Sequence, residues 1–195
     1  MKLEEDLWSQ HQYQVLVSFV HHLAYYRVLR RFYVDLKQDS EFWTRTINAH
    51  LLRAVIDWCM VFGTDSNQIH WKRVAADENA QQDFRRFVLD VASLTQDELD
   101  TYWSKMTIFR NDFAAHKIVA SNYPAAPDMD TALVVATAYD DWLRQAVNAA
   151  FDEPSLQGRY DRLMRTTEES LRQLISLGPT LEQEYESRPP RNPRF

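Results

Sequence analysis

Glycine is scarce in this chain, and its scarcity limits both the fold and the chemistry. Three glycines occur in 195 residues, although glycine is the usual residue of tight turns and of loops that wrap phosphate groups. A glycine-rich phosphate loop therefore has no place in the sequence. Apolar residues recur at helical spacing almost throughout, and no segment shows the alternation of a strand. We expect an all-α domain.

Cysteine and long apolar runs are lacking as well. The one cysteine, Cys59, cannot form an internal disulfide or a Cys-x-x-Cys metal site. Because it lies on an apolar helical face, we interpret Cys59 as a packed core thiol rather than a nucleophile. No run of about 18 apolar residues suggests a membrane span, and no charged leader precedes an apolar segment. We expect a soluble, cytoplasmic protein.

Positive charge is in deficit. The net charge of -6 argues against a protein that coats nucleic acid by bulk electrostatics. Arg27, Arg30 and Arg31 nevertheless fall at i, i+3 and i+4, so one helix face would carry three cations. A solvated or salt-bridged face is the commoner outcome for such a cluster, and a local basic cleft is the alternative.

Metal-binding patterns are absent. The chain has no His-Glu-x-x-His pair, and the adjacent His21 and His22 would point about 100° apart on a helix. We interpret these two, with His11 and His50, as ordinary surface or core histidines. No metal and no cofactor are predicted.

The whole chain divides into a helical domain, residues 1–187, and a tail rich in arginine and proline, residues 188–195. The tail is predicted to be disordered. Glycine and proline set two of the helix ends, at Gly63 and at Gly178-Pro179. The second helix is apolar around much of its circumference and is predicted to be the central core helix. The predicted helices cover residues 4–37 as one or two helices, 39–63, 79–93, 96 to about 116, 128 or 130 to 151, and 155–177.

The fourth of these helices carries the segment that bears chemistry. Thr95 and Glu98 form a capping-box pattern that begins the helix, and Arg110 and His116 lie near its end. On an unbroken α-helix, six steps of about 100° would turn His116 roughly 240° from Arg110 and about 9 Å along the axis. The two side chains would not share a face. A helix break near Ala115, or a second copy of the chain, must bring them together if they act jointly.

Two interpretations of this pair remain open. In the structural one, Arg110 and His116 satisfy carbonyl groups and the dipole at a helix C-terminus. In the chemical one, they supply what phosphodiester cleavage needs without a metal. The arginine would neutralise the non-bridging phosphate oxygens, and the histidine would transfer a proton to or from the reacting oxygen.

The segment from Phe109-Arg110-Asn111 to Ala115-His116 resembles the signature of the HEPN superfamily, in which an arginine, usually followed by a polar residue, precedes a histidine after a short spacer.

Upstream, Asp57-Trp58, Val61-Phe62-Gly63 and His70-Trp71 resemble the branch near the abortive-infection AbiU-like proteins of bacteria. Together these resemblances cover much of the first two-thirds of the chain. They imply a bundle of about five to seven helices that dimerises with the motif helices facing each other, so that two Arg/His sets line one cleft. Many members of the family are metal-independent ribonucleases of toxin-antitoxin or phage-defence systems. They use a ribose 2'-OH as nucleophile and leave cyclic phosphate ends.

By this similarity Arg110 is the phosphate binder, Asn111 its polar orienter and His116 the acid/base. Lys105 and Lys117, which flank the motif, are the candidate substrate-binding residues. The implied partners are RNA, a second copy of the chain and an antitoxin or defence-system protein.

Asp112 departs from the family's pattern. A carboxylate beside the arginine would repel phosphate unless it points away or supports His116. Several family members are non-catalytic, so the alternative function is a HEPN-like helical interaction or nucleotide/RNA-binding module. A cleft ringed by acidic residues would favour that alternative.

Overall fold

The computed structural model describes residues 5–36, 41–115, 125–147 and 152–186. Within these ranges the chain is helical and contains no strand, which confirms the predicted all-α class. Six α-helices have fourteen residues or more, within the predicted five to seven. The elements are α1 (Glu5–Leu7), the π-helix η1 (Trp8–Gln12), α2 (Tyr13–Arg31), α3 (Glu41–Phe62), α4 (Trp71–Val74), α5 (Glu78–Ala92), α6 (Gln96–Phe109), the π-helix η2 (Arg110–Ala115), α7 (Met129–Val147) and α8 (Leu156–Glu186).

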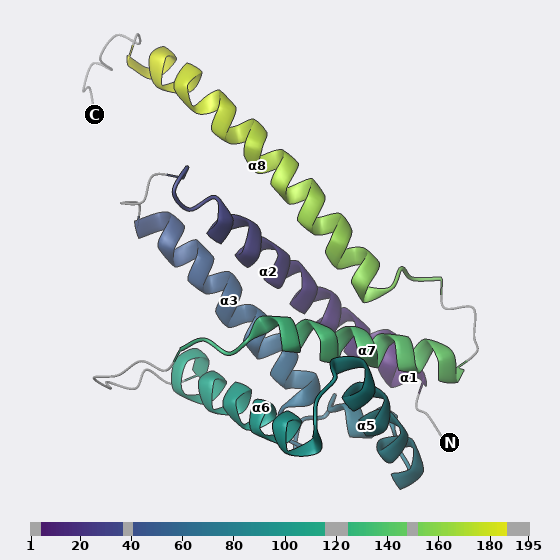
Figure 1. Cartoon of the computed structure of the whole chain (residues 1–195). Coiled ribbons are helices and arrows are strands. Elements are labelled where there is room, and N and C mark those ends of the chain that lie inside the picture. Colours follow the sequence, from purple (N-terminus) through teal and green to yellow (C-terminus); the bar gives the residue numbers. More distant parts are fainter. Residues whose placement is uncertain (1–4, 37–40, 116–124, 148–151, 187–195) are drawn as a thin grey trace, which may run out of the picture.

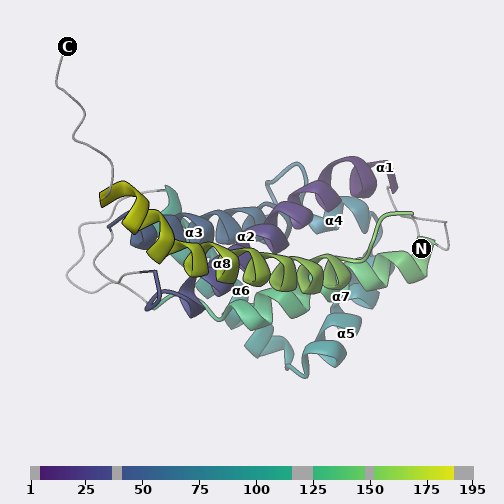
Figure 2. The same cartoon turned by 90° about the horizontal axis from the view of Figure 1, so that it is seen from above.

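Helix α2 lies between α3 and α8, and the three run alongside one another (Figures 1 and 2). Helices α5, α6 and α7 gather at the end of this layer where α3 finishes (Figure 1). Helix α7 packs on α5, α2 and α8, and α6 with η2 packs on α3. The segment Arg110–Ala115 therefore packs against α3.

The core follows from the helical spacing of apolar residues. On the first long helix, the apolar residues that recur at helical spacing are buried: Leu16, Phe19, Val20, Leu23, Tyr26 and Leu29. Helix α3 buries residues around most of its circumference from Ile47 onward, as predicted for a central helix. In its first turn, Phe42 is 65% exposed, whereas Trp43 beside it is half-buried and packs against the core.

Local hydrogen bonds account for several helix ends. The predicted capping box is present, with the hydroxyl of Thr95 accepting from the Glu98 N–H and the Glu98 carboxylate accepting from the Thr95 N–H. Of the two positions predicted to begin α7, 128 and 130, Asp128 is the one that caps it, since its carboxylate accepts from the backbone N–H groups of Asp130 and Thr131 at 3.0 and 3.1 Å.

Gly63 follows the end of α3 as predicted, but for a different reason. Its φ is not positive, so it is not the left-handed cap that favours glycine. A Cβ at this position would lie 2.3 Å from the Cys59 carbonyl oxygen. Glycine is needed here because the backbone turns back closely on the last turn of α3.

The predicted end of the last helix at Gly178-Pro179 is wrong. Helix α8 continues to Glu186. An interior proline costs a helix about 3 kcal/mol or more, but the Leu, Glu and Gln residues that follow it are strong helix formers. Helix α7 is described to Val147. Its predicted extension to 151, the predicted start of the second helix at 39 and the tail 188–195 lie outside the described residues. In the described ranges, no helix combines the length and apolar character needed to cross a bilayer.

Candidate functional site

Arg110 marks a change in helix geometry. It follows the last residue of α6 and begins the π-helix η2, Arg110–Ala115. The motif is thus at the C-terminal end of the helix, as predicted, but it does not continue as an α-helix. A π-helix bonds each residue to the fifth one along, and such segments are frequent at functional sites. The 240° expected between Arg110 and His116 therefore does not apply beyond Phe109.

The guanidinium of Arg110 is oriented by its neighbour. Its Nε and Nη2 atoms donate to Asn111 Oδ1 at 3.0 and 2.7 Å. Among the described residues, no carboxylate forms an ion pair with Arg110, which leaves its remaining N–H donors available to an anion. The rings of Phe109 and Phe113, 5.0 Å apart and 9° from parallel, stack across the same turn. Arg110 is thus a half-buried cation on a packed element.

Asp112 is half-buried in the same π-helix. It makes no hydrogen bond or ion pair with another residue in the described part of the chain. His116 and Lys117 lie outside the described residues, so the convergence of Arg110 with His116, and any support of His116 by Asp112, stay predictions.

Lys105 is exposed on α6 and lines a pocket of about 410 Å³ with Ile108, Phe109 and segment 125–128. Lys105 precedes Arg110 by five positions, which turns the two side chains about 140° apart on the helix. The structure does not bring Lys105 and Arg110 to one face of a single chain.

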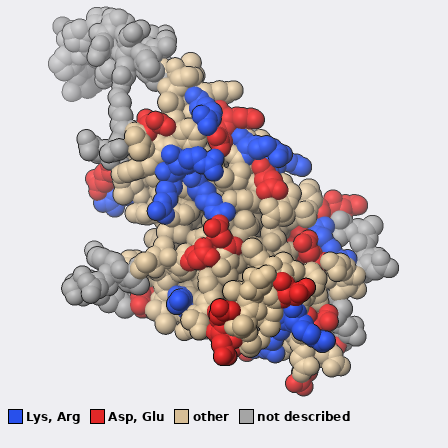
Figure 3. Space-filling view, viewed as in Figure 1, with Lys and Arg blue, Asp and Glu red and all other residues tan. Residues whose placement is uncertain are grey.

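The three arginines of α2 line a groove of about 660 Å³ beside the start of α7, where Figure 3 shows blue side chains gathered over α2 and α8. Arg27 pairs with Asp130, and Arg31 pairs with Glu168 at 2.7 Å. The salt-bridged interpretation is therefore correct for these two.

Arg30 is the exception in this groove. It donates to the Tyr26 hydroxyl and forms no ion pair with the carboxylates that the structure describes.

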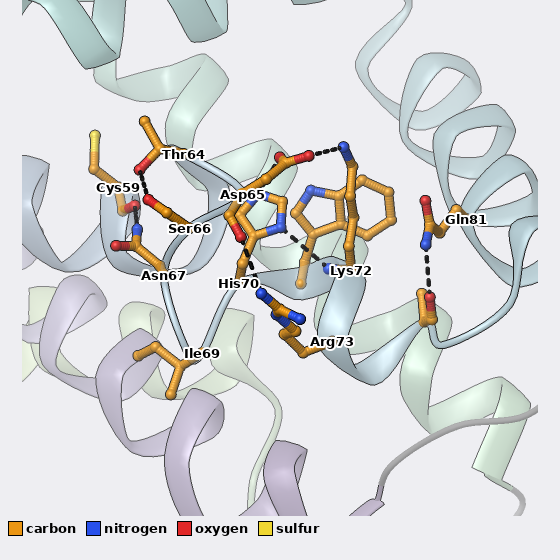
Figure 4. A network of polar contacts seen from close by, with 12 residues as sticks. Cys59, Thr64, Asp65, Ser66, Asn67, Ile69, His70, Lys72, Arg73 and Gln81 are labelled. Atoms are coloured by element: carbon orange, nitrogen blue, oxygen red, sulfur yellow. Dashed lines mark hydrogen bonds and ion pairs between the residues drawn. The ribbon is translucent and has the colours of Figure 1, made fainter.

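The loop after α3 forms a polar network around His70, shown in Figure 4. His70 Nδ1 accepts from the Lys72 backbone N–H at 3.4 Å, and its Nε2 lies 3.5 Å from Asp65 Oδ1. Lys72 Nζ holds the other oxygen of Asp65 at 2.6 Å. Burial lowers the pKa of His70 to about 4. His70 is therefore a neutral residue that fixes the loop, with both ring nitrogens engaged.

Beside this loop lies a pocket of about 440 Å³ whose walls come from the end of α3, the loop, α4, α5 and α6. One wall is Arg85, a half-buried arginine whose guanidinium carbon lies 5.6 Å from the centre of the Trp71 ring. Nothing in the sequence pattern marks Arg85, because the pocket exists only once these segments meet.

The other residues singled out in the sequence are structural. Cys59 is fully buried, and burial raises the pKa of its thiol to about 12, which confirms a core thiol. Asp57 is buried and accepts from the Ser18 hydroxyl at 2.6 Å, while Trp58 Nε1 donates to the Ala132 carbonyl at 3.1 Å. Both members of the Asp57-Trp58 pair thus join helices.

His22 and His50 meet between α2 and α3, with their Nδ1 atoms 2.8 Å apart. One ring donates to the other, and burial lowers the pKa of both. In the part of the chain that the structure describes, no three side chains of metal-binding type come together.

Comparisons with protein-family models, with curated proteins and with solved structures find no match to this chain.

Proposed function

We propose that the protein is a metal-independent endoribonuclease of the HEPN type, acting as a symmetric dimer in a toxin or phage-defence role. The observation that supports this most is the state of Arg110. It is a half-buried guanidinium at a helix end, oriented by Asn111 and paired with no described carboxylate. Such a group suits bidentate binding of a phosphate.

In the proposed reaction, Arg110 binds the non-bridging oxygens of the scissile phosphate and Asn111 keeps the guanidinium in place. One histidine at position 116 removes the proton from the ribose 2'-OH, whose oxygen then bonds to phosphorus. The bond from phosphorus to the 5'-oxygen breaks, and a histidine from the second copy protonates that oxygen. The products are a 2',3'-cyclic phosphate and a 5'-hydroxyl end.

Cleavage of RNA in EDTA tests the proposal. Arg110→Ala and His116→Ala should each lower the rate by about 10²- to 10⁴-fold, as expected for loss of charge stabilisation or of a general acid/base. Arg86→Ala and His11→Ala are matched controls, because both residues are exposed and lie on other elements; they should cleave like the parent. Equal cleavage by all five proteins, or none by the parent, contradicts a nuclease at this motif.

The second candidate is a non-catalytic HEPN-like interaction or nucleotide/RNA-binding module. Asp112 favours it, because its carboxylate lies two residues from Arg110 in the same π-helix and would oppose a phosphate there. Expression of the chain alone separates the candidates. Growth arrest that disappears with His116→Ala supports the nuclease, and no arrest by the parent supports the binding module.

A further inference from the structure

One face of α6 joins the pocket beside His70 to the arginine motif. Gln96, Asp100 and Trp103 line the pocket and follow one another at i, i+4 and i+7. Arg110 is seven residues beyond Trp103, which places it within about 20° of the same stripe and about 10 Å further along the axis. The pocket and the side chain of Arg110 therefore lie on the same side of α6.

The pocket contains donors without acceptors. Arg85 is half-buried against the Trp71 ring. Its guanidinium makes no hydrogen bond or ion pair with the residues that the structure describes, although, after Lys72 and His70, its charge also lowers the pKa of Asp65 in the same pocket. The indole Nε1 of Trp103 has no acceptor among them either, but this atom is fully buried behind the pocket wall and out of reach of a ligand. The donors that face the pocket are therefore those of Arg85, and a ligand with acceptor atoms can bind them.

The pocket also contains an available acceptor. Asp65 is engaged by Lys72 at 2.6 Å and lies close to His70. Asp100 is exposed, and only its Oδ1 is used, by Gln96 Nε2 at 2.8 Å. A guanidinium on one side and a free carboxylate oxygen on the other match the edge of a nucleobase, which presents acceptors and N–H donors together.

We propose that this pocket binds one nucleotide of an RNA strand that also contacts Arg110. The proposal deepens the proposed function and rests on it for the identity of the ligand. Arg85 binds acceptor atoms of the base or of its phosphate, and Asp100 accepts from the base N–H groups. The rise of about 10 Å along α6 is a distance that a single strand crosses within a few nucleotides. The pocket would then select which phosphate reaches Arg110.

Arg85 and Arg86 form a matched pair for the test. They are neighbours on α5, but Arg85 lines the pocket whereas Arg86 is exposed outside it. In a His116→Ala background, which prevents the proposed cleavage, single-stranded RNA binding is measured by fluorescence anisotropy at fixed salt. Arg85→Ala should weaken binding about 10- to 100-fold, the effect of losing charged hydrogen bonds. Arg86→Ala should leave binding close to the parent value.

Arg85→Lys keeps the charge but loses the planar fork, and it should bind more weakly than the parent and more tightly than Arg85→Ala. Thermal melting of each variant shows whether it is folded. Titration of the four ribonucleoside 5'-monophosphates by calorimetry shows base selection, which Asp100→Asn should reduce.

Equal losses from Arg85→Ala and Arg86→Ala would mean general electrostatic attraction and would overturn the inference. Binding of free mononucleotides without any effect of Arg85 on RNA would also overturn it, in favour of a metabolite site. The proposed nuclease is judged separately. If Arg85→Ala binds RNA normally while cleavage still needs Arg110 and His116, the nucleotide pocket is contradicted and the nuclease is not. If RNA binding needs Arg85 but the parent protein does not cleave RNA, the nuclease is contradicted and the pocket is not.

Discussion

His70 shows how one buried side chain can make stability depend on pH. It is 2% exposed, and its imidazole faces Asp65, Lys72 and Arg73. Its pKa of about 4 in the folded chain lies below the ordinary value of 6.5. Between pH 6.5 and pH 4, His70 is therefore protonated in the unfolded chain but neutral in the folded state.

As pH falls below about 6.5, the unfolded state gains this proton first, so the free energy of unfolding should decrease until pH approaches 4. The contribution of His70 to this loss is at most about 3 kcal/mol. Urea unfolding between pH 7 and pH 4.5 should show a smaller pH dependence for His70→Gln than for the parent. His11→Gln, at an exposed histidine, should retain the parent's dependence. An unchanged dependence in His70→Gln would show that another group is responsible.

At the scale of residues, sequence reasoning succeeded where the environment is local. The core character of Cys59 followed from its place on an apolar helical face, and the capping pair of Thr95 and Glu98 from its spacing. The surroundings of Arg85 and Gln12 could not be predicted, because they come from segments far away in the chain. Their partners are known only once the fold is known.

At the scale of elements, π-helices lie at the ends of two long helices in the described chain, η1 before α2 and η2 after α6. In η1, Gln12 is fully buried. Its Nε2 donates to the carbonyls of Ile69 and His70, both at 3.1 Å, and its Oε1 accepts from the Tyr139 hydroxyl at 2.7 Å. This amide therefore joins the first helical segment, the loop before α4, and α7.

Gln12→Leu should destabilise the protein by about 1–3 kcal/mol for each buried group left without a partner. The midpoint of urea unfolding measures the loss. Gln14→Leu serves as the control, because Gln14 is exposed two residues away and its replacement should change the midpoint little. A similar midpoint for both variants would show that water or a shifted neighbour replaces the Gln12 amide.

The positions of the long helices could be predicted because a period of 3.6 residues is a local property of the sequence. The π-segments could not, since one extra residue per turn is hidden within an otherwise apolar pattern. The end of α8 at Glu186 could not be predicted from Gly178-Pro179 either, because the helix formers that follow the proline allow the helix to continue.

At the scale of the whole molecule, assembly decides whether the motif is one site or half of one. Ile108 on α6 is 52% exposed and Met60 on α3 is 37% exposed, and both lie on the two helices that meet at η2. We expect these apolar side chains to be covered in a symmetric dimer. Helical periodicity predicts the fold class but carries no information about this contact.

Light scattering should therefore give twice the mass of the chain at micromolar concentration, and Ile108→Asp should shift the mass toward one chain by placing a charge in the contact. Leu174→Asp, at an exposed leucine of α8, should leave the mass unchanged. A parent protein with the mass of a single chain would rule out a site shared between two copies.

The buried thiol provides a way to observe motion at the motif. Cys59, the chain's single cysteine, lies where α3 meets α6, with its Sγ 3.7 Å from the Met106 carbonyl oxygen. A thiol reagent can reach it only when these two helices separate. The rate at which the reagent labels Cys59 under native conditions then measures how often α3 and α6 separate locally next to Arg110.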